Sequence, residues 1–174
     1  KYETTKWGII KSAALSIVIL GVIMWGIIPG VIIVAGWFEL LFVNGFGMPF
    51  NTGVIIYALL LIAGLTFGIR YTLKHNHTVV NTILTCFVVM LIGYSCYAMV
   101  VIRSVSNPPI DENSPDNVFS LLSYISRDQY GQEPLVYGPY FNAPVIGVED
   151  AGPVYYQNEK TGKYDIVDHK KEVK

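Results

Sequence analysis

Residues 12–38 read SAALSIVILGVIMWGIIPGVIIVAGWF and contain no Asp, Glu, Lys or Arg. Beyond Glu39, these four residue types are also absent from 40–69 and from 75–102. An uncharged, mainly apolar run of about 18 or more residues is long enough to cross the hydrocarbon core of a bilayer. A soluble fold rarely needs three such runs in succession. The pattern therefore predicts a membrane protein.

The composition favours a lipid environment and divides the chain into two parts. Of the 174 residues, 52% are hydrophobic and 14% are charged, whereas soluble domains average about 25% charged residues. Residues 1–110 carry six basic and two acidic side chains, and residues 111–174 carry six basic and eleven acidic ones. Neither part has a basic cluster of the kind that follows a phosphate backbone, which argues against nucleic acid as a partner.

The predicted fold is an all-α polytopic membrane region over residues 1–106. Pro29 removes a helix donor and Gly30 loosens the backbone, so we expect a break at this point. The apolar run that follows, 31–43, would span only about 20 Å as a helix, and we expect an interfacial or re-entrant half-helix there. The three predicted transmembrane crossings cover residues 11–28, 54–71 and 79–102.

Basic residues mark the side of the membrane on which each connection lies. The N-terminal end carries Lys1, Lys6 and Lys11, and the short connector 70–77 is also basic. The positive-inside rule places both in the cytoplasm. The region 29–53 has no basic residue and is expected to face outward. Three crossings then deliver the acidic tail to the outer side.

The tail, residues 107–174, is predicted to be a small α+β segment. A helix over about 115–129 is expected, because Ser114 can cap it and Pro115 suits its first turn. A hairpin over about 154–167 is expected from two strand-like runs that flank a turn sequence. One helix and one hairpin are too little to bury a core, so the tail should pack on the membrane region or on further chain.

Two residues of the membrane region are candidate substrate-binding residues. Glu39 is a lone carboxylate in apolar sequence, and such residues are often functional; the alternative is that it snorkels to the outer interface. Asn51 lies in a glycine-rich loop that is expected to be irregular and accessible to water. Both would lie near the outer headgroups.

Four residues of the tail are further substrate-binding candidates. Asp111 and Glu112 could bind a bridging divalent cation or orient a polar substrate; alternatively they belong to a solvated linker that caps the next helix. Tyr137 and Tyr140 could stack on a sugar ring or anchor the chain at the interface. The histidines lack metal-ligand spacing, so no metal site is predicted.

Two sets of motifs resemble a known family. The first comprises Phe38-Glu39-Leu40-Leu41-Phe42-Val43-Asn44 and Gly47-Met48-Pro49-Phe50-Asn51-Thr52-Gly53. The second comprises Pro108-Pro109-Ile110-Asp111-Glu112-Asn113-Ser114-Pro115 and the run from Tyr130 to Tyr140, YGQEPLVYGPY. Together they resemble large bacterial multipass membrane proteins, long filed as a domain of unknown function, over most of residues 7–145. That family is similar to protein O-mannosyltransferases within the GT-C membrane glycosyltransferases.

The resemblance implies an inner-membrane enzyme with its C-terminal segment in the periplasm. The whole protein would transfer a sugar from a polyprenyl-phosphate-linked donor to a periplasmic (protein) acceptor. The catalytic acid of such enzymes lies in the first outward loop, which would precede Lys1, so no catalytic residue is assigned in this chain. We expect the chain to be a piece of this larger polypeptide, with no cofactor of its own. The alternative is a non-catalytic membrane anchor or assembly subunit whose acidic outer segment binds partner proteins.

Overall fold

The computed structural model is mainly helical and ends in a two-stranded antiparallel sheet. It describes residues 5–106, 108–110, 114–128 and 148–173. The helices in chain order are α1 (Lys6–Gly21), η1 (Val22–Ile27), α2 (Ile28–Leu40), η2 (Leu41–Gly45), α3 (Thr52–Lys74), α4 (Thr78–Tyr94), α5 (Cys96–Val105) and α6 (Val118–Ser126). The strands are β1 (Val148–Asn158) and β2 (Lys163–Val173).

Three helical stretches of the described chain are long and apolar enough to cross a membrane: Lys6–Gly45, Thr52–Lys74 and Thr78–Val105. Most of their large side chains do not pack within the chain; Trp25 is 80% exposed and Phe67 is 72% exposed. Apolar side chains that cover helices all round belong in lipid or against other helices. These long helices with exposed apolar side chains therefore agree with the predicted membrane association.

The first stretch corrects the prediction of a separate half-helix over 31–43. The helix continues without a break from Lys6 to Gly45, and Pro29 lies in the first turn of α2. Just before it, η1 has the wider turns of a π-helix. Such a bulge accommodates a residue that cannot donate to the helical ladder, so the proline begins a new α segment and does not end the helix.

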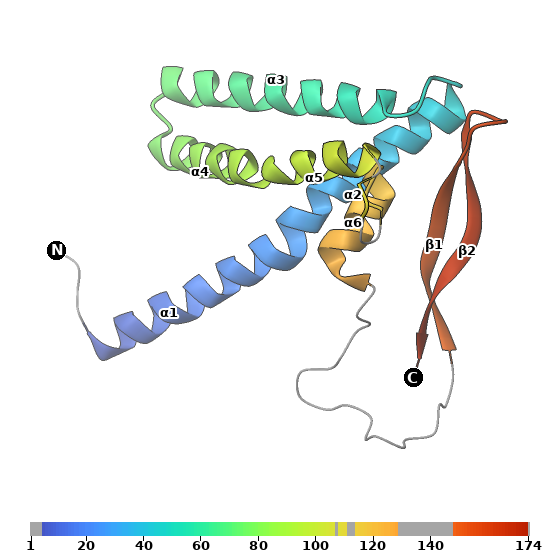
Figure 1. The fold of residues 1–174 in the computed structure, drawn as a ribbon. Coiled ribbons are helices and arrows are strands. Elements are labelled where there is room, and N and C mark those ends of the chain that lie inside the picture. Colours follow the sequence, from blue (N-terminus) through green and yellow to red (C-terminus); the bar gives the residue numbers. More distant parts are fainter. Residues whose placement is uncertain (1–4, 107, 111–113, 129–147, 174) are drawn as a thin grey trace.

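Helices α3 and α4 form an antiparallel pair joined by a short loop. The side-chain amide of Asn81 donates to the Thr72 hydroxyl at 2.9 Å, which stabilises the end of the pair next to the loop. A Cβ on Gly68 would lie 3.3 Å from Leu84, so this small residue lets the two helices approach. The loop and the N-terminal end of α1 lie toward one end of the molecule, and the hairpin lies at the other (Figure 1).

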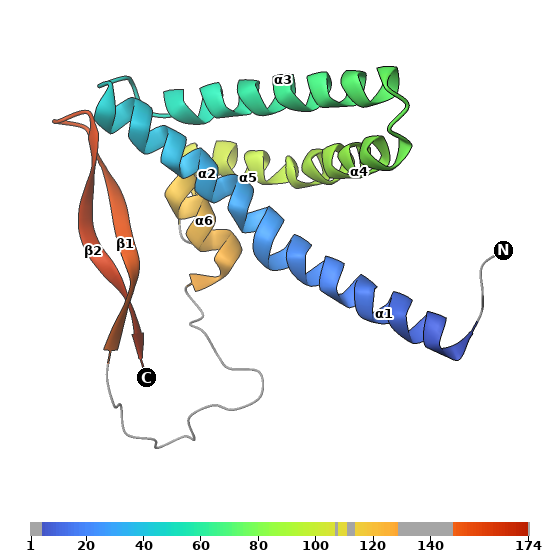
Figure 2. The same ribbon diagram turned by 180° about the vertical axis from the view of Figure 1, so that it is seen from behind.

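The tail packs against the membrane region, as expected. Seen from behind, α6 lies against α2, and the turn of the hairpin meets the end of that long helix (Figure 2). The hairpin is longer than 154–167, and the helix begins at Val118 and not at 115. Its cap is Asn117, whose side chain accepts from the backbone of Phe119 and Ser120. This capping box replaces the predicted Ser114 cap because Ser114 adopts a positive φ of 37°.

Candidate functional site

Glu39 is fully buried at the end of α2, with 0% of its surface exposed. One carboxylate oxygen accepts from the backbone N–H of Asn51 at 2.5 Å, and the other accepts from the N–H of Val54 at 3.1 Å. The first N–H groups of a helix lack partners within it, and a negative charge there favours the helix dipole. Glu39 therefore caps α3 from a neighbouring helix, and the snorkelling alternative is wrong.

The backbone around Asn51 is shaped to bring this cap close. Asn51 has a left-handed φ of 68°, a conformation that asparagine tolerates better than most residues. Two residues later, a Cβ on Gly53 would lie 2.4 Å from the carbonyl oxygen of Phe38 and 2.5 Å from Cα of Glu39. Only glycine fits there, because the start of α3 lies directly against the backbone of α2.

Tyr164 brings the hairpin to the same carboxylate. Its hydroxyl donates to Glu39 at 3.1 Å and accepts from the side-chain amide of Gln157 at 2.9 Å. Its ring is 4% exposed and contacts Phe50 and Phe119 edge-on, with ring centroids 5.2 and 5.0 Å apart. A buried tyrosine normally finds a partner for its hydroxyl, and here the partner is the membrane-region carboxylate.

Asn44 binds the backbone of the same tyrosine. Its side-chain amide donates to the carbonyl of Tyr164 at 2.9 Å and accepts from the N–H of Tyr164 at 2.8 Å. The side-chain amide of Asn44 thus makes the two hydrogen bonds with Tyr164 that the backbone of a neighbouring strand would make. Together, Glu39 and Asn44 attach the hairpin to the end of the first apolar helix.

The environment of Tyr164 keeps its phenol protonated. Burial raises its pKa well above the ordinary value of 10, and the Glu39 carboxylate raises it further, while the hydrogen bond from Gln157 acts in the opposite direction. A neutral phenol can donate to Glu39, whereas a phenolate would repel it. The contact between hairpin and membrane region therefore depends on this proton.

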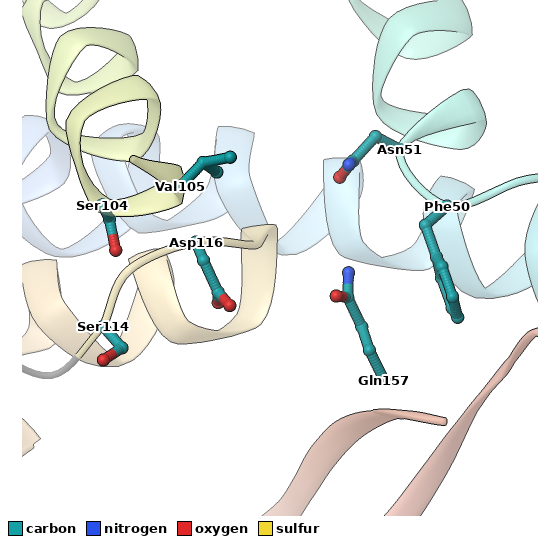
Figure 3. Close-up of a pocket in the computed structure, with 7 residues that line it drawn as sticks. All are labelled: Phe50, Asn51, Ser104, Val105, Ser114, Asp116 and Gln157. Atoms are coloured by element: carbon teal, nitrogen blue, oxygen red, sulfur yellow. The ribbon is translucent and has the colours of Figure 1, made fainter. Parts of the chain in front are cut away.

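The hydrogen-bonded residues Glu39, Asn44, Asn51, Gln157 and Tyr164 form a buried network. An open pocket of about 410 Å³ lies beside this network. It is bounded by the loop before α3, the end of α5, the segment before α6, and β1 (Figure 3). Helix α3 begins and α5 ends next to it, so the pocket lies where two membrane-spanning stretches end. The lining residues with polar or aromatic side chains are Phe50, Asn51, Ser104, Ser114, Asp116 and Gln157.

The pocket shares residues with the buried network. The backbone N–H of Asn51 donates to Glu39 while its side chain reaches into the pocket, and Gln157 approaches from the opposite wall (Figure 3). Among the described residues that line the pocket, Asp116 alone has a formal charge. Its Oδ1 accepts from Asn117 and Ser120 at 2.8 and 3.1 Å, and Oδ2 is oriented by these contacts.

The structure describes two of the six predicted site residues. These two residues, Glu39 and Asn51, are joined by the hydrogen bond from the Asn51 backbone N–H to the Glu39 carboxylate. The other four candidates, Asp111, Glu112, Tyr137 and Tyr140, lie outside the described residues. Within the described ranges, no three His, Cys, Asp or Glu side chains gather as a metal site would require.

Three residues of the buried network around Glu39 were not predicted as site residues. Asn44, Tyr164 and Gln157 come from segments about 120 residues apart, and nothing local marks their meeting. Asn44 gave the one available signal, a polar residue at the end of a long apolar run. Tyr164 is one of 12 tyrosines in the chain, and its sequence neighbours do not distinguish it.

Comparison with known proteins adds no relative, since no family model, no curated protein and no solved structure matches the chain.

Proposed function

We propose that this chain is a portion of a GT-C-type glycosyltransferase of the bacterial inner membrane, and that its pocket faces the periplasm. The full-length enzyme transfers a sugar from a polyprenyl-phosphate-linked donor to a periplasmic acceptor. The catalytic acid belongs to another part of the polypeptide. In this portion, the apolar helices hold a polar pocket at the level where the headgroup of a lipid-linked donor lies.

One observation supports the proposal most directly. The two sets of family-like motifs lie about 60 residues apart in the sequence, yet both contribute to one pocket: Phe50 and Asn51 come from the first set and Ser114 from the second. Irregular backbone near a bilayer is tolerated where it lines a cavity. Small-molecule sites also combine a few convergent polar groups with an apolar wall.

The position of the pocket fits a lipid-linked substrate. It opens where α3 begins and α5 ends, so a polyprenyl chain could remain among the lipids while its sugar enters the pocket. The basic residues Arg70 and Lys74 are near the opposite end of α3. Under the positive-inside rule, this basic end favours the cytoplasm, which supports the proposal that the pocket faces the periplasm.

The activity is tested with the full-length protein purified into phospholipid nanodiscs. We expect it to transfer radiolabelled sugar from a polyprenyl-phosphate donor to a periplasmic protein. Asn51→Gly should lower the transfer rate, because it removes the pocket amide while glycine keeps the positive φ. Asn76→Gly is the matched control, since Asn76 also has a positive φ, 56°, in the loop at the other end of α3. No transfer by the unaltered protein would contradict the proposal.

A second function, a non-catalytic membrane anchor or assembly subunit, is favoured by a different observation. The hairpin presents large apolar side chains to solvent, including Tyr156, Ile166 and Val167, on a sheet with only two strands. Under this alternative, replacing Ile166 and Val167 by threonine would release a co-purifying partner protein and leave any transfer activity unchanged. Loss of transfer in Asn51→Gly with retention of all partners would favour the enzyme.

A further inference from the structure

The lining of the pocket selects among kinds of ligand by its charge. The six side chains named above include two amides, two hydroxyls, one carboxylate and one phenyl ring, and no Lys, Arg or His lines the pocket among the residues that the structure describes. Amides, hydroxyls and a carboxylate together offer both donors and acceptors. A phosphate would meet Asp116 without a compensating cation, so its binding here would be repulsive.

We propose that this pocket holds the uncharged, hydroxyl-bearing ring of a sugar, with the phosphate of the donor outside it. Asn51, Asp116 and Gln157 bind the hydroxyls, and one face of the ring lies against Phe50. The inference rests on the proposed function for the lipid carrier, whereas the choice of a polyhydroxyl ligand follows from the lining itself. The pocket volume of about 410 Å³ is within the roughly 300–1,000 Å³ of small-ligand sites.

The hydrogen-bonding groups are held in place before a ligand arrives. The backbone of Asn51 is fixed by Glu39, and one amide hydrogen of Gln157 is held by the Tyr164 hydroxyl. Gln157 still offers its carbonyl oxygen and a second amide hydrogen. Asp116 is oriented by Asn117 and Ser120 through Oδ1, which leaves Oδ2 to accept from a sugar hydroxyl. Fixed groups cost less entropy on binding.

An organic cation is the competing ligand class, because Asp116 and Phe50 could bind an ammonium group. That arrangement would not use the amides of Asn51 and Gln157, whose side chains point toward each other across the pocket (Figure 3). A sugar ring uses all of them at once. Dependence on the Asn51 side chain therefore separates the two classes.

The test measures binding directly by saturation-transfer NMR, with the full-length protein in phospholipid nanodiscs. The probes are methyl mannoside and methyl glucoside, with inorganic phosphate and tetramethylammonium as charged controls. We expect the two glycosides to bind and the charged probes not to bind. Asn51→Gly should weaken glycoside binding about five- to tenfold, the effect of losing one or two hydrogen bonds, and Asn76→Gly should leave it unchanged.

Asp116→Asn provides a second, independent variant. It keeps an oxygen for Asn117 and Ser120 but removes the charge, and we expect about tenfold weaker glycoside binding because hydrogen bonds to a carboxylate are the stronger ones. Equal effects of Asn51→Gly and Asn76→Gly would overturn the proposal. So would binding of tetramethylammonium that is lost in Asp116→Asn and retained in Asn51→Gly, or binding of phosphate by the unaltered protein.

The outcomes separate this inference from the proposed function. Glycoside binding that depends on Asn51, without any sugar transfer by the full-length protein, would refute the enzyme and leave the pocket assignment standing. Sugar transfer that is unaffected by Asn51→Gly and Asp116→Asn would refute the pocket assignment and leave the enzyme standing.

Discussion

A carboxylate inside an apolar helix is stable only where donors surround it. Glu39 meets three donors from two other segments: the N–H groups of Asn51 and Val54 and the hydroxyl of Tyr164. Each of these donors needs a partner, because Val54 lies in the first turn of α3, Asn51 is the residue directly before that turn, and Tyr164 is buried. The Glu39 carboxylate therefore accepts hydrogen bonds from three donors that would destabilise the fold if they were buried without an acceptor.

Glu39→Gln should destabilise the protein although it preserves shape. A glutamine has one acceptor and one donor group, so its NH₂ would face a backbone N–H that needs an acceptor. We expect a loss of about 2–3 kcal/mol in unfolding free energy, the usual effect of leaving buried groups unpaired. Denaturant unfolding in detergent would measure it, with Glu159→Gln on the exposed hairpin turn as the control. Equal stability of the two variants would contradict the capping role.

Gly53→Ala tests the close approach of α3 to α2. The added methyl would lie inside contact distance of the backbone of Phe38 and Glu39, and backbone cannot rotate away as a side chain can. We expect a loss of about 1–3 kcal/mol or more in unfolding free energy. Gly64→Ala in the same helix is the matched control, because nothing lies within 4 Å of its added Cβ. A Gly53→Ala protein as stable as Gly64→Ala would show that the two backbones are further apart.

At the scale of elements, the hairpin depends on contacts outside itself. An isolated two-stranded hairpin is marginally stable in water, and this one belongs to a sheet of two strands. Tyr164 supplies the missing contact, since its ring packs on Phe50 and Phe119 and its hydroxyl reaches Glu39. The side-chain amide of Asn44 adds two hydrogen bonds to the backbone of Tyr164. The hairpin is therefore attached by its turn end to the end of the first long helix.

The raised pKa of Tyr164 predicts a pH dependence of this attachment. Below about pH 10 the phenol is neutral in the folded and the unfolded chain, so its contribution to stability is fully present. As the pH rises above 10, the unfolded tyrosine ionises first and the contribution falls. Tyr164→Phe lacks it throughout and should be about 1–2 kcal/mol less stable at pH 8.

Unfolding of both proteins between pH 8 and 11 gives the measurement. The difference in unfolding free energy between the unaltered protein and Tyr164→Phe should shrink above pH 10. The other titratable groups are the same in both proteins, so their effects on stability cancel in this difference. Tyr156→Phe, on an exposed tyrosine of β1, should show no difference at any pH. A difference for Tyr164→Phe that stays constant to pH 11 would mean that the hydroxyl is not buried against Glu39.

Much of the secondary structure could be predicted because it depends on local patterns. Three apolar runs gave the three long helices, and the turn sequence 158–162 gave the hairpin. The half-helix was mispredicted because Pro29 is usually a helix breaker, and the π-helical turns that accommodate it leave no clear sequence mark. The α6 cap was misplaced by three residues, since Asn117 and Ser114 are both good cap residues.

The candidate site was harder to predict because its residues meet only in three dimensions. The sequence singled out Glu39 as an unusual carboxylate, but its partners are two backbone groups and a tyrosine 125 residues away. Backbone donors carry no residue identity, so no motif can reveal them. Likewise, Asp116 and Gln157 reach the pocket only because the tail folds back onto α2.

At the scale of the whole molecule, the three apolar stretches and the attached tail give the protein two chemically different ends. The loop between α3 and α4 lies toward one end and the hairpin lies at the other (Figure 1). The basic residues Arg70 and Lys74 directly precede that loop, and the pocket is lined by residues from the opposite end of α3 and from the hairpin. The first stretch, with 40 residues, is about 60 Å long as a helix, longer than the roughly 30 Å hydrocarbon core. It must tilt or project from the bilayer.

The proposed topology has the hairpin and the loop between α3 and α4 on opposite sides of one membrane. It is tested in intact bacterial cells with a membrane-impermeant maleimide, after Cys86 and Cys96 have been replaced by alanine. Lys160→Cys, on the hairpin turn, should be labelled in intact cells, and His77→Cys, in the loop, only after the cells are made permeable. Labelling of both from the same side would contradict the claim, because a single crossing could not then lie between them.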